Sequence, residues 1–326
     1  MAQCNNSLLT RRRFMAVGGV GLATSMRPVW SHEPDSMKRI VFIAGTSSHD
    51  FGGHQHAAGC RFLANCLNAL PHVKTEVVAD QWPSDERIFD GVDAVIIYGD
   101  GGGSHIVNGH EETVAQLIRR GVGLGILHYA LMPPTEQMYS LFLQGIGGYY
   151  EPGWSVNPTW HAEIKHLPVH PITRGVKPFA IKDEWYYHMR FVPEFKGVQP
   201  LLSVVPPAST LKRPDGPHSN NPAVRKEVLE LGRAQHLAWA YERPDRGRGF
   251  GFTGAHTYWN WAHSDIRTLV LNAIAWLAHM DIPEKGIPSS PPSAKFLAEF
   301  VGPAPTGFEF EPVQRMIDRW NTGNRP

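Results

Sequence analysis

The sequence KRIVFIAG spans residues 38–45 and places five consecutive apolar residues directly before a glycine. An uninterrupted apolar run of this kind is typical of a strand that is buried on both faces of a parallel sheet. Residues 93–98, DAVIIY, and residues 123–128, GLGILH, repeat the pattern, and residues 75–78, TEVV, indicate another strand. These four segments predict the strands of one sheet.

Stretches with helical character, residues 55–70 and 110–120, alternate with these strands. Strands and helices that alternate at this spacing predict an α/β fold with a doubly wound, mostly parallel sheet and helices on both of its faces. Residues 131–232 differ, because they are rich in Pro and aromatic residues, with short extended pieces at 159–165 and 181–188. We interpret this region as a long excursion packed over the sheet's edge.

The chain then returns to the regular pattern. Residues 235–241 and 249–253 have the character of strands, and residues 265–279 that of an amphipathic helix. The α/β domain is therefore expected to span residues 37–282. We interpret residues 283–326 as a C-terminal tail that wraps the domain and ends in a short helix.

Residues 1–36 have the character of an export signal. Residues 10–15 read TRRRFM, and an uncharged, weakly apolar run follows at residues 16–25. An arginine pair, a bulky apolar residue and a short apolar run match a twin-arginine signal, and the run is too short to span a bilayer. We expect an exported, periplasmic protein with no membrane segment in its mature form. A chance basic and apolar leader is the alternative.

Composition excludes several classes of protein. The 31 basic and 30 acidic residues leave a net charge of +1, which argues against a nucleic-acid partner. No CxxC motif is formed by the three cysteines, Cys4, Cys60 and Cys66. Neither a thiolate zinc site nor a disulfide framework is therefore expected. The glycines after Asp100 are not followed by Lys and Ser or Thr, so no nucleotide cofactor is expected.

Histidines follow the first predicted strand. His49, His54 and His56 lie in or next to a Gly-rich loop, and imidazoles are common ligands of zinc and similar ions. We select His49 and His56 as candidate metal ligands and regard His54 as the weakest of the three. The alternative is that such loop histidines are ordinary polar surface residues.

The other predicted strand ends carry related side chains. Asp100 follows the third strand, His128 ends the fourth, and His256 follows a late strand. Because ligands bind at the carboxyl ends of the strands in such sheets, these residues are expected to share one site. His128 is the strongest candidate, since it ends an apolar strand, although a histidine there can also be a satisfied core residue.

Residues 183–188, DEWYYH, combine carboxylates, aromatic rings and a histidine. In an extended segment Glu184, Tyr186 and His188 would share one face. A carboxylate can complete a histidine site for one divalent ion such as zinc or manganese. An amphipathic strand without such a role is the alternative. The expected ligands are His49, His56, His128, Glu184 and His256.

Aromatic residues lie near these loops. Flat aromatic faces beside carboxylates suit the apolar faces and hydroxyl edges of sugar rings, although Trp and Tyr are also common core residues. The candidate substrate-binding residues are Asp100, Trp154, Trp185, Tyr258 and Trp259.

Several short motifs, taken in order, resemble the ThuA-like (trehalose utilisation) family over roughly residues 39–279. This family has a class I glutamine amidotransferase-like, flavodoxin-like fold. The matching motifs are His49-Asp50, His56, GVGLGILH at 121–128, HPITRG at 170–175, DEWY at 183–186 and the segment from Gly247 to His256.

The resemblance implies a role in carbohydrate metabolism, with a divalent metal at the histidine-rich edge. The implied substrates are 3-keto-glycosides, small carbohydrates that a partner sugar oxidoreductase would supply. In the amidotransferase relatives the position of His128 would hold the nucleophilic Cys, so glutaminase activity is not expected. A segment at residues 213–222, RPDGPHSNNP, matches none of the family's motifs and reads as a substrate loop or an ordinary surface turn.

A metal-dependent lyase or hydrolase for such sugars is the function expected. It needs a base for the proton at C2 and an acid for the leaving oxygen. Two alternatives stay open: a carbohydrate-binding module without activity on a degenerate amidotransferase-like fold, and a metal-dependent hydrolase of a non-sugar molecule. The candidate catalytic residues are His49, Asp50, Glu184, Tyr186 and His188.

Overall fold

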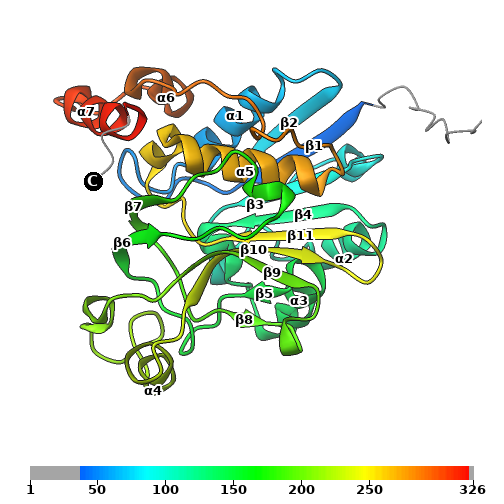
Figure 1. The fold of residues 1–326 in the computed structure, drawn as a ribbon. Helices are drawn as coiled ribbons and strands as arrows, with labels where there is room; N and C mark the ends of the chain where they lie inside the picture. Colours follow the sequence, from blue (N-terminus) through cyan, green and yellow to red (C-terminus); the bar gives the residue numbers. More distant parts are fainter. Residues whose placement is uncertain (1–36, 323–326) are drawn as a thin grey trace, which may run out of the picture. The chain divides into compact units, whose positions relative to one another are not determined.

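The computed structural model of the protein describes residues 37–322. Their central sheet contains seven strands, in the spatial order β2-β1-β3-β4-β11-β10-β9 (Figure 1). In chain order the strands are β1 (Lys38–Ala44), β2 (Val73–Ala79), β3 (Ala94–Tyr98), β4 (Gly123–Leu127), β9 (Val198–Val204), β10 (Gln235–Glu242) and β11 (Arg248–Phe252).

Most of this sheet is parallel. β1 pairs in parallel with β2 and β3, β3 with β4, and β4 with β11. β10 is antiparallel to both β11 and β9. The carboxyl ends of β1, β3, β4 and β11 therefore meet at one edge of the sheet, as expected from the sequence.

Helices cover both faces of the sheet (Figure 1). α1 (His56–Leu67) and α5 (Ser264–Leu277) lie on one face, and α2 (Glu111–Arg119) and α3 (Tyr139–Ile146) on the other. Successive residues of a strand point to opposite faces, so Phe42 joins the core under α1 and α5 while Val41 joins the core under α2 and α3. This double burial is the reason that residues 40–44 of β1 and the whole of β3 and β4 are continuously apolar, and it confirms the doubly wound α/β fold.

The excursion adds two small sheets beside the central one. β5 (Gly148–Tyr149) pairs with β8 (Arg190–Phe191), and β6 (Thr159–Ile164) pairs antiparallel with β7 (Phe179–Glu184). The strand expected at residues 181–188 is shifted, because β7 ends at Glu184. Beyond it, Tyr187 forms an isolated bridge with Val156.

The C-terminal segment contains two helices rather than the single short one expected. α6 (Ala294–Val301) and α7 (Phe310–Asn321) follow residue 282, and Leu297 and Ile317 are buried in the core shared with α1 and α5. Within the described residues, no helix is both long and apolar enough to cross a membrane. The predicted export signal at residues 1–36 lies outside the described residues.

Candidate active site

His54, from the loop after β1, is oriented by a carboxylate from another strand end. Its Nδ1 lies 3.0 Å from Oδ1 of Asp100, which follows β3. Ser48 Oγ lies 2.9 Å from the same Nδ1 and donates to Asp100 at 3.0 Å. A carboxylate only accepts hydrogen bonds, so His54 Nδ1 carries the proton. Nε2 of the neutral ring then carries a free lone pair.

His128 is oriented in the same way, by a backbone carbonyl. It directly follows β4, it is fully buried, and its φ of 57° is uncommon for a residue other than glycine. Its Nδ1 lies 2.9 Å from the carbonyl oxygen of Thr253, at the end of β11. Since a carbonyl only accepts, Nδ1 of His128 also carries a proton, so Nε2 is the nitrogen available to face His54.

The two Nε2 atoms face each other at 3.0 Å. Two lone pairs at this distance repel unless a cation or a proton lies between them. Burial lowers the pKa of His54 to about 4, against the opposing effect of the hydrogen bond to Asp100. At neutral pH the ring of His54 is therefore uncharged, and the pair of imidazoles has the character of a metal-binding arrangement.

Glu184 and His256 complete the group. Glu184, the last residue of β7, places Oε2 3.5 Å from Nε2 of His128 and 3.1 Å from Nδ1 of His256. Despite this distance, the buried Nδ1 of His256 is not aligned for a hydrogen bond within the described part of the chain. Burial alone would raise the pKa of Glu184, but His128 and His256 hold it well below its ordinary value, so the carboxylate is ionised.

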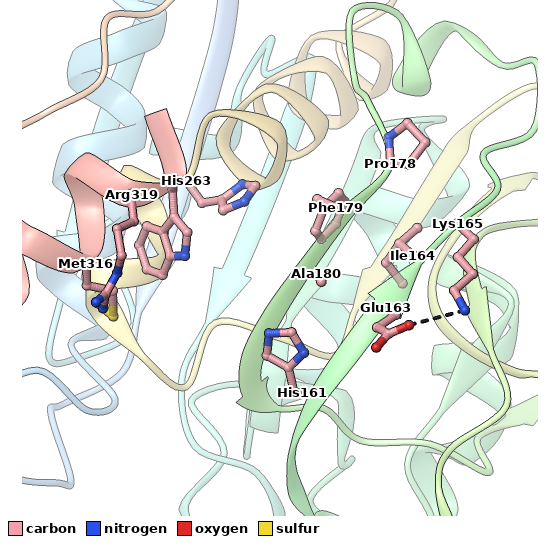
Figure 2. Close-up of a pocket in the computed structure, with 11 residues that line it drawn as sticks. His161, Glu163, Ile164, Lys165, Pro178, Phe179, Ala180, His263, Met316 and Arg319 are labelled. Carbon is pink, nitrogen blue, oxygen red and sulfur yellow. Dashed lines mark ion pairs between the residues drawn. The ribbon is translucent and has the colours of Figure 1, made fainter. Parts of the chain in front are cut away.

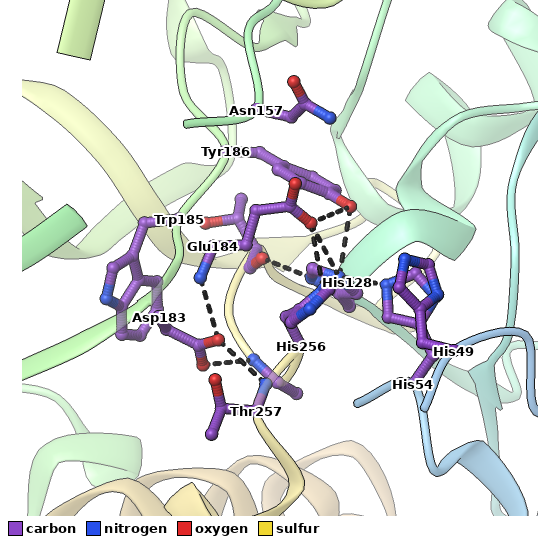
Figure 3. Close-up of polar contacts among 12 residues, drawn as sticks. His49, His54, His128, Asn157, Asp183, Glu184, Trp185, Tyr186, His256 and Thr257 are labelled. Carbon is purple, nitrogen blue, oxygen red and sulfur yellow. Dashed lines mark hydrogen bonds and ion pairs between the residues drawn. The ribbon is translucent and has the colours of Figure 1, made fainter. Parts of the chain in front are cut away.

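Figure 3 shows these side chains pointing toward one another. The ligand atoms of His54, His128, Glu184 and His256 all lie within 4.8 Å of one another. Three imidazoles and one carboxylate fit a divalent ion such as zinc or manganese. The side chains of Glu184 and His256 are 16% and 26% exposed, so solvent reaches the group from their side.

Asp183 connects the strand that carries Glu184 to the loop that carries His256. Its buried carboxylate accepts hydrogen bonds from the backbone N–H groups of Ala255 at 2.8 Å and Thr257 at 3.0 Å. These bonds fix the position of His256 relative to β7. Asp183 thus positions two candidate ligands without contacting the other two.

Two tyrosines lie against the group. The hydroxyl of Tyr186 is 3.1 Å from Nε2 of His128 and donates to Oε2 of Glu184 at 3.2 Å. Burial and the nearby Glu184 raise the pKa of Tyr186 well above its ordinary value. Tyr129 is half-buried, and burial together with the charges of Asp100 and Glu184 raises its pKa. Tyr129 is not among the residues predicted from the sequence, where its only signal is its place next to His128 at a strand end.

The other predicted residues of the first loop lie around the group. His49 is exposed at its rim, with its ring centre 3.8 Å from that of His54 and 5.1 Å from that of His256. His56 is fully buried behind His54, and its Nε2 lies 3.8 Å from Oδ1 of Asp100. Neither belongs to the group of four, which contains His54 instead, but His54, His56 and Asp100 form a second group whose ligand atoms lie within 4.8 Å of one another. Asp50 is exposed, and its backbone carbonyl accepts a hydrogen bond from Gly53 N–H.

His188 does not share the face of Glu184 and Tyr186, which corrects the expectation. Because β7 ends at Glu184 and the φ of His188 is 59°, the alternation of side chains is lost. The His188 ring stacks on Trp154 at 4.2 Å, and its Nδ1 lies 2.8 Å from the carbonyl oxygen of Trp154. Arg190 covers the Trp154 ring at 3.5 Å. Trp154 and His188 therefore pair with each other.

The remaining aromatic candidates belong to the core, which is a second correction. Trp185 is fully buried, with Nε1 donating to the carbonyl oxygen of Ile181. Tyr258 is fully buried and donates its hydroxyl hydrogen to the carbonyl oxygen of Leu297 at 2.8 Å. Trp259 stacks on Phe308 of the C-terminal segment. Of the expected substrate-binding residues, Asp100 alone contacts the histidine group.

A cavity of about 700 Å³ lies elsewhere, between the β6–β7 hairpin and α7 (Figure 2). Trp320 and Arg319 line it on the helix side, and Phe179 on the hairpin side. Glu163 and Lys165 on its wall form an ion pair at 3.2 Å. None of the candidate metal ligands lines this cavity. We assign the chemistry to the histidine group, since cavity size alone creates no reactive group.

The comparisons with known proteins agree with this architecture. The sequence profile of the ThuA family, described as trehalose utilisation, matches residues 39–277. A search of curated proteins finds no match.

Among solved structures, a ThuA-like protein from Bacteroides uniformis has a TM-score of 0.51 and 16% identity, covering 76% of this chain and 93% of its own. Another, from Parabacteroides merdae, has a TM-score of 0.48 and 14% identity, covering 79% of this chain and 94% of its own. A glutamine amidotransferase from Thermotoga maritima has a TM-score of 0.44 and 8% identity, covering 74% of this chain and 98% of its own. The family profile spans most of the chain, and the protein therefore belongs to the ThuA family.

Proposed function

We propose that the protein is an exported, metal-dependent carbohydrate-active enzyme that cleaves 3-keto-glycosides. One observation carries the proposal: the facing Nε2 atoms of His54 and His128 lie within ligand distance of Glu184 and His256. Membership of the trehalose utilisation family supports a carbohydrate substrate.

His54, His128, Glu184 and His256 would hold one divalent ion, zinc or manganese. Such an ion acts as a Lewis acid, stabilising negative charge that develops on a substrate oxygen. Asp100 and the Thr253 carbonyl hold the two imidazoles in the tautomer that leaves Nε2 free. Tyr186 restrains Glu184 through its hydroxyl. No nucleotide cofactor enters the proposed reaction.

The proposed reaction is an elimination across C1 and C2 of the sugar. The ketone at C3 acidifies the proton at C2, and His49 at the exposed rim takes that proton. A C1–C2 double bond forms from the released electron pair as the bond from C1 to the glycosidic oxygen breaks. Tyr129, beside Asp100 and Glu184, donates a proton to the departing oxygen. Proton uptake and release balance between His49 and Tyr129.

The cellular context of the proposal follows from the sequence. A twin-arginine signal exports proteins in the folded state, which suits a protein that binds its metal before export. The 3-keto substrate requires prior oxidation of a sugar hydroxyl, so a sugar oxidoreductase is the partner in the proposed pathway.

The first experiment measures metal content and turnover together. Purified protein should contain about one divalent ion per chain by elemental analysis. His128→Ala should lose this ion, because a site with four ligands tolerates few losses. The protein with its metal should cleave a 3-keto-glucoside disaccharide. His161→Ala, at an exposed position on β6, is the matched control and should behave like the wild type. Sugar binding without metal and without turnover would favour the binding-module alternative.

A further inference from the structure

Residues 213–220 match no motif of the family. They lie near the histidine group, on the far side of two tyrosine rings. Nδ1 of His218 is 2.9 Å from the hydroxyl of Tyr150, and the two rings stack at 5.6 Å. The Tyr150 ring in turn packs edge to face on Tyr186 at 5.4 Å. Tyr186 contacts both His128 and Glu184, so two tyrosine rings separate His218 from the candidate ligands.

This segment has a fixed conformation of its own. The amide nitrogen of Asn220 donates to the carbonyl oxygens of Leu211 at 2.8 Å and Arg213 at 3.1 Å. Gly216 N–H donates to the carbonyl oxygen of Asn220 at 3.1 Å, and Ser219 Oγ donates to that of Pro214 at 2.7 Å. Such internal bonding preorganises the side chains that the segment presents.

The segment is also bonded at two points to residues 153 and 157, which lie earlier in the excursion. Gly153 N–H donates to the carbonyl oxygen of Pro217 at 2.8 Å, and Asn157 N–H donates to that of His218 at 3.0 Å. The position of His218 relative to Tyr150 is therefore held from both sides. An ordinary surface turn would not need these bonds to a neighbouring segment.

Three polar side chains here have hydrogen-bonding groups without a partner among residues 37–322. Nη2 of Arg213 donates to Asn157 Oδ1 at 2.8 Å and to the carbonyl oxygen of His218 at 3.1 Å. Its Nε and Nη1 leave three further N–H donors. Asn157 directly follows Val156, which pairs with Tyr187, and Figure 3 draws Asn157 above Tyr186. Its Oδ1 accepts from Arg213, which leaves its NH₂ group as a donor. Nε2 of His218 is the third such group, because Tyr150 occupies Nδ1.

We propose that Arg213, Asn157 and His218 form a recognition subsite for the second, hydroxyl-bearing unit of the substrate. This inference rests on the proposed function and adds which part of the substrate the subsite binds. Sugar hydroxyls both donate and accept, so a guanidinium, an amide and an imidazole nitrogen at fixed positions suit neighbouring hydroxyls of one ring. Burial and the charge of Arg213 lower the pKa of His218, and the charge of Glu184 opposes them.

The experiment compares two substrates in the full-length protein with its metal. One is a 3-keto-glucoside disaccharide, and the other is the methyl 3-keto-glucoside, which lacks the second ring. His218→Ala and Arg213→Lys should each raise KM for the disaccharide about tenfold, through the loss of hydrogen bonds to the second ring. Both variants should keep the wild-type KM for the methyl glycoside and the wild-type metal content.

A matched control lies in the same segment. Asp215 pairs with Arg225 on the surface, so Asp215→Asn should leave both KM values unchanged. Arg213→Lys keeps the positive charge of the side chain. Thermal unfolding of this variant checks that it is folded. Equal effects on both substrates, or none on either, would overturn the subsite while leaving the proposed function in place. A wild type that cleaves neither substrate would overturn both.

Discussion

At the scale of single residues, the hydrogen bond from His54 to Asp100 decides which ring nitrogen is free for a ligand. Such outer partners typically change metal affinity by about 10- to 100-fold. We therefore expect Asp100→Ala to weaken zinc binding by that factor, as measured by competition with a coloured chelator. Asp100→Asn should lose less, because its amide oxygen still accepts the bond.

Asp50→Ala is the control for this experiment, since Asp50 is an exposed carboxylate in the same loop as His54. It should bind zinc like the wild type. Equal zinc affinity in Asp100→Ala and the wild type would show that Asp100 does not orient His54.

His105 provides a test of pH dependence away from the candidate ligands. It is buried, its Nε2 bonds to the Ala130 carbonyl oxygen and its Nδ1 accepts from Val107 N–H, and burial lowers its pKa to about 4. As the pH falls below the ordinary value of about 6.5, the unfolded chain takes up a proton that the folded protein does not. Stability is therefore lost between these two pH values, by up to about 3 kcal/mol.

We expect His105→Gln to lose less stability than the wild type on acidification, measured as the free energy of unfolding in urea at about pH 7 and about pH 4.5. The comparison concerns the pH slope alone, because the substitution also changes the absolute stability. His166→Gln, at an exposed position, should keep the wild-type slope. Identical slopes in all three proteins would contradict a buried, neutral His105.

The sequence predicted the location of the site better than its ligands. His128 and His256 were expected because each follows a predicted strand end, and Glu184 because its segment combines carboxylates with aromatic rings and a histidine. His54 was rated below His49 and His56, because loop spacing does not reveal which of three nearby imidazoles turns inward. That choice depends on Asp100, which lies 46 residues away in the sequence.

At the scale of elements, Asp183 joins β7 to the loop after β11, so one carboxylate holds Glu184 and His256 together. Hydrogen bonds to a charged group contribute about 1.5–3 kcal/mol each. We expect Asp183→Asn to lower the melting temperature by several degrees and to weaken zinc binding, as measured by calorimetry of both processes. Lys182→Ala, an exposed neighbour on the same strand, should change neither. Unchanged zinc binding in Asp183→Asn would show that the loop holds its position without this carboxylate.

Elements buried on both faces were the easiest to predict. Residues 40–44 of β1 and the whole of β3 and β4 are continuously apolar because both of their faces pack against helices. The end of β7 could not be predicted, since the aromatic residues 185–187 that follow it also favour a strand. They leave the strand because Tyr187 pairs instead with Val156, a contact between segments that a single sequence does not reveal. His188 was misplaced for this reason.

At the scale of the whole molecule, the C-terminal helices reach the loop that carries His256. Leu297 of α6 is fully buried, and its carbonyl oxygen accepts the hydroxyl of Tyr258, two residues beyond His256. Truncating a buried leucine to alanine costs about 2–5 kcal/mol. We expect Leu297→Ala to lower the melting temperature clearly and to weaken zinc binding slightly, because the 256–259 segment loses part of its support. Glu299→Ala, an exposed position on the same helix, is the control and should match the wild type in both measurements. A melting temperature equal to the wild type would mean that the C-terminal segment packs loosely and does not support the site.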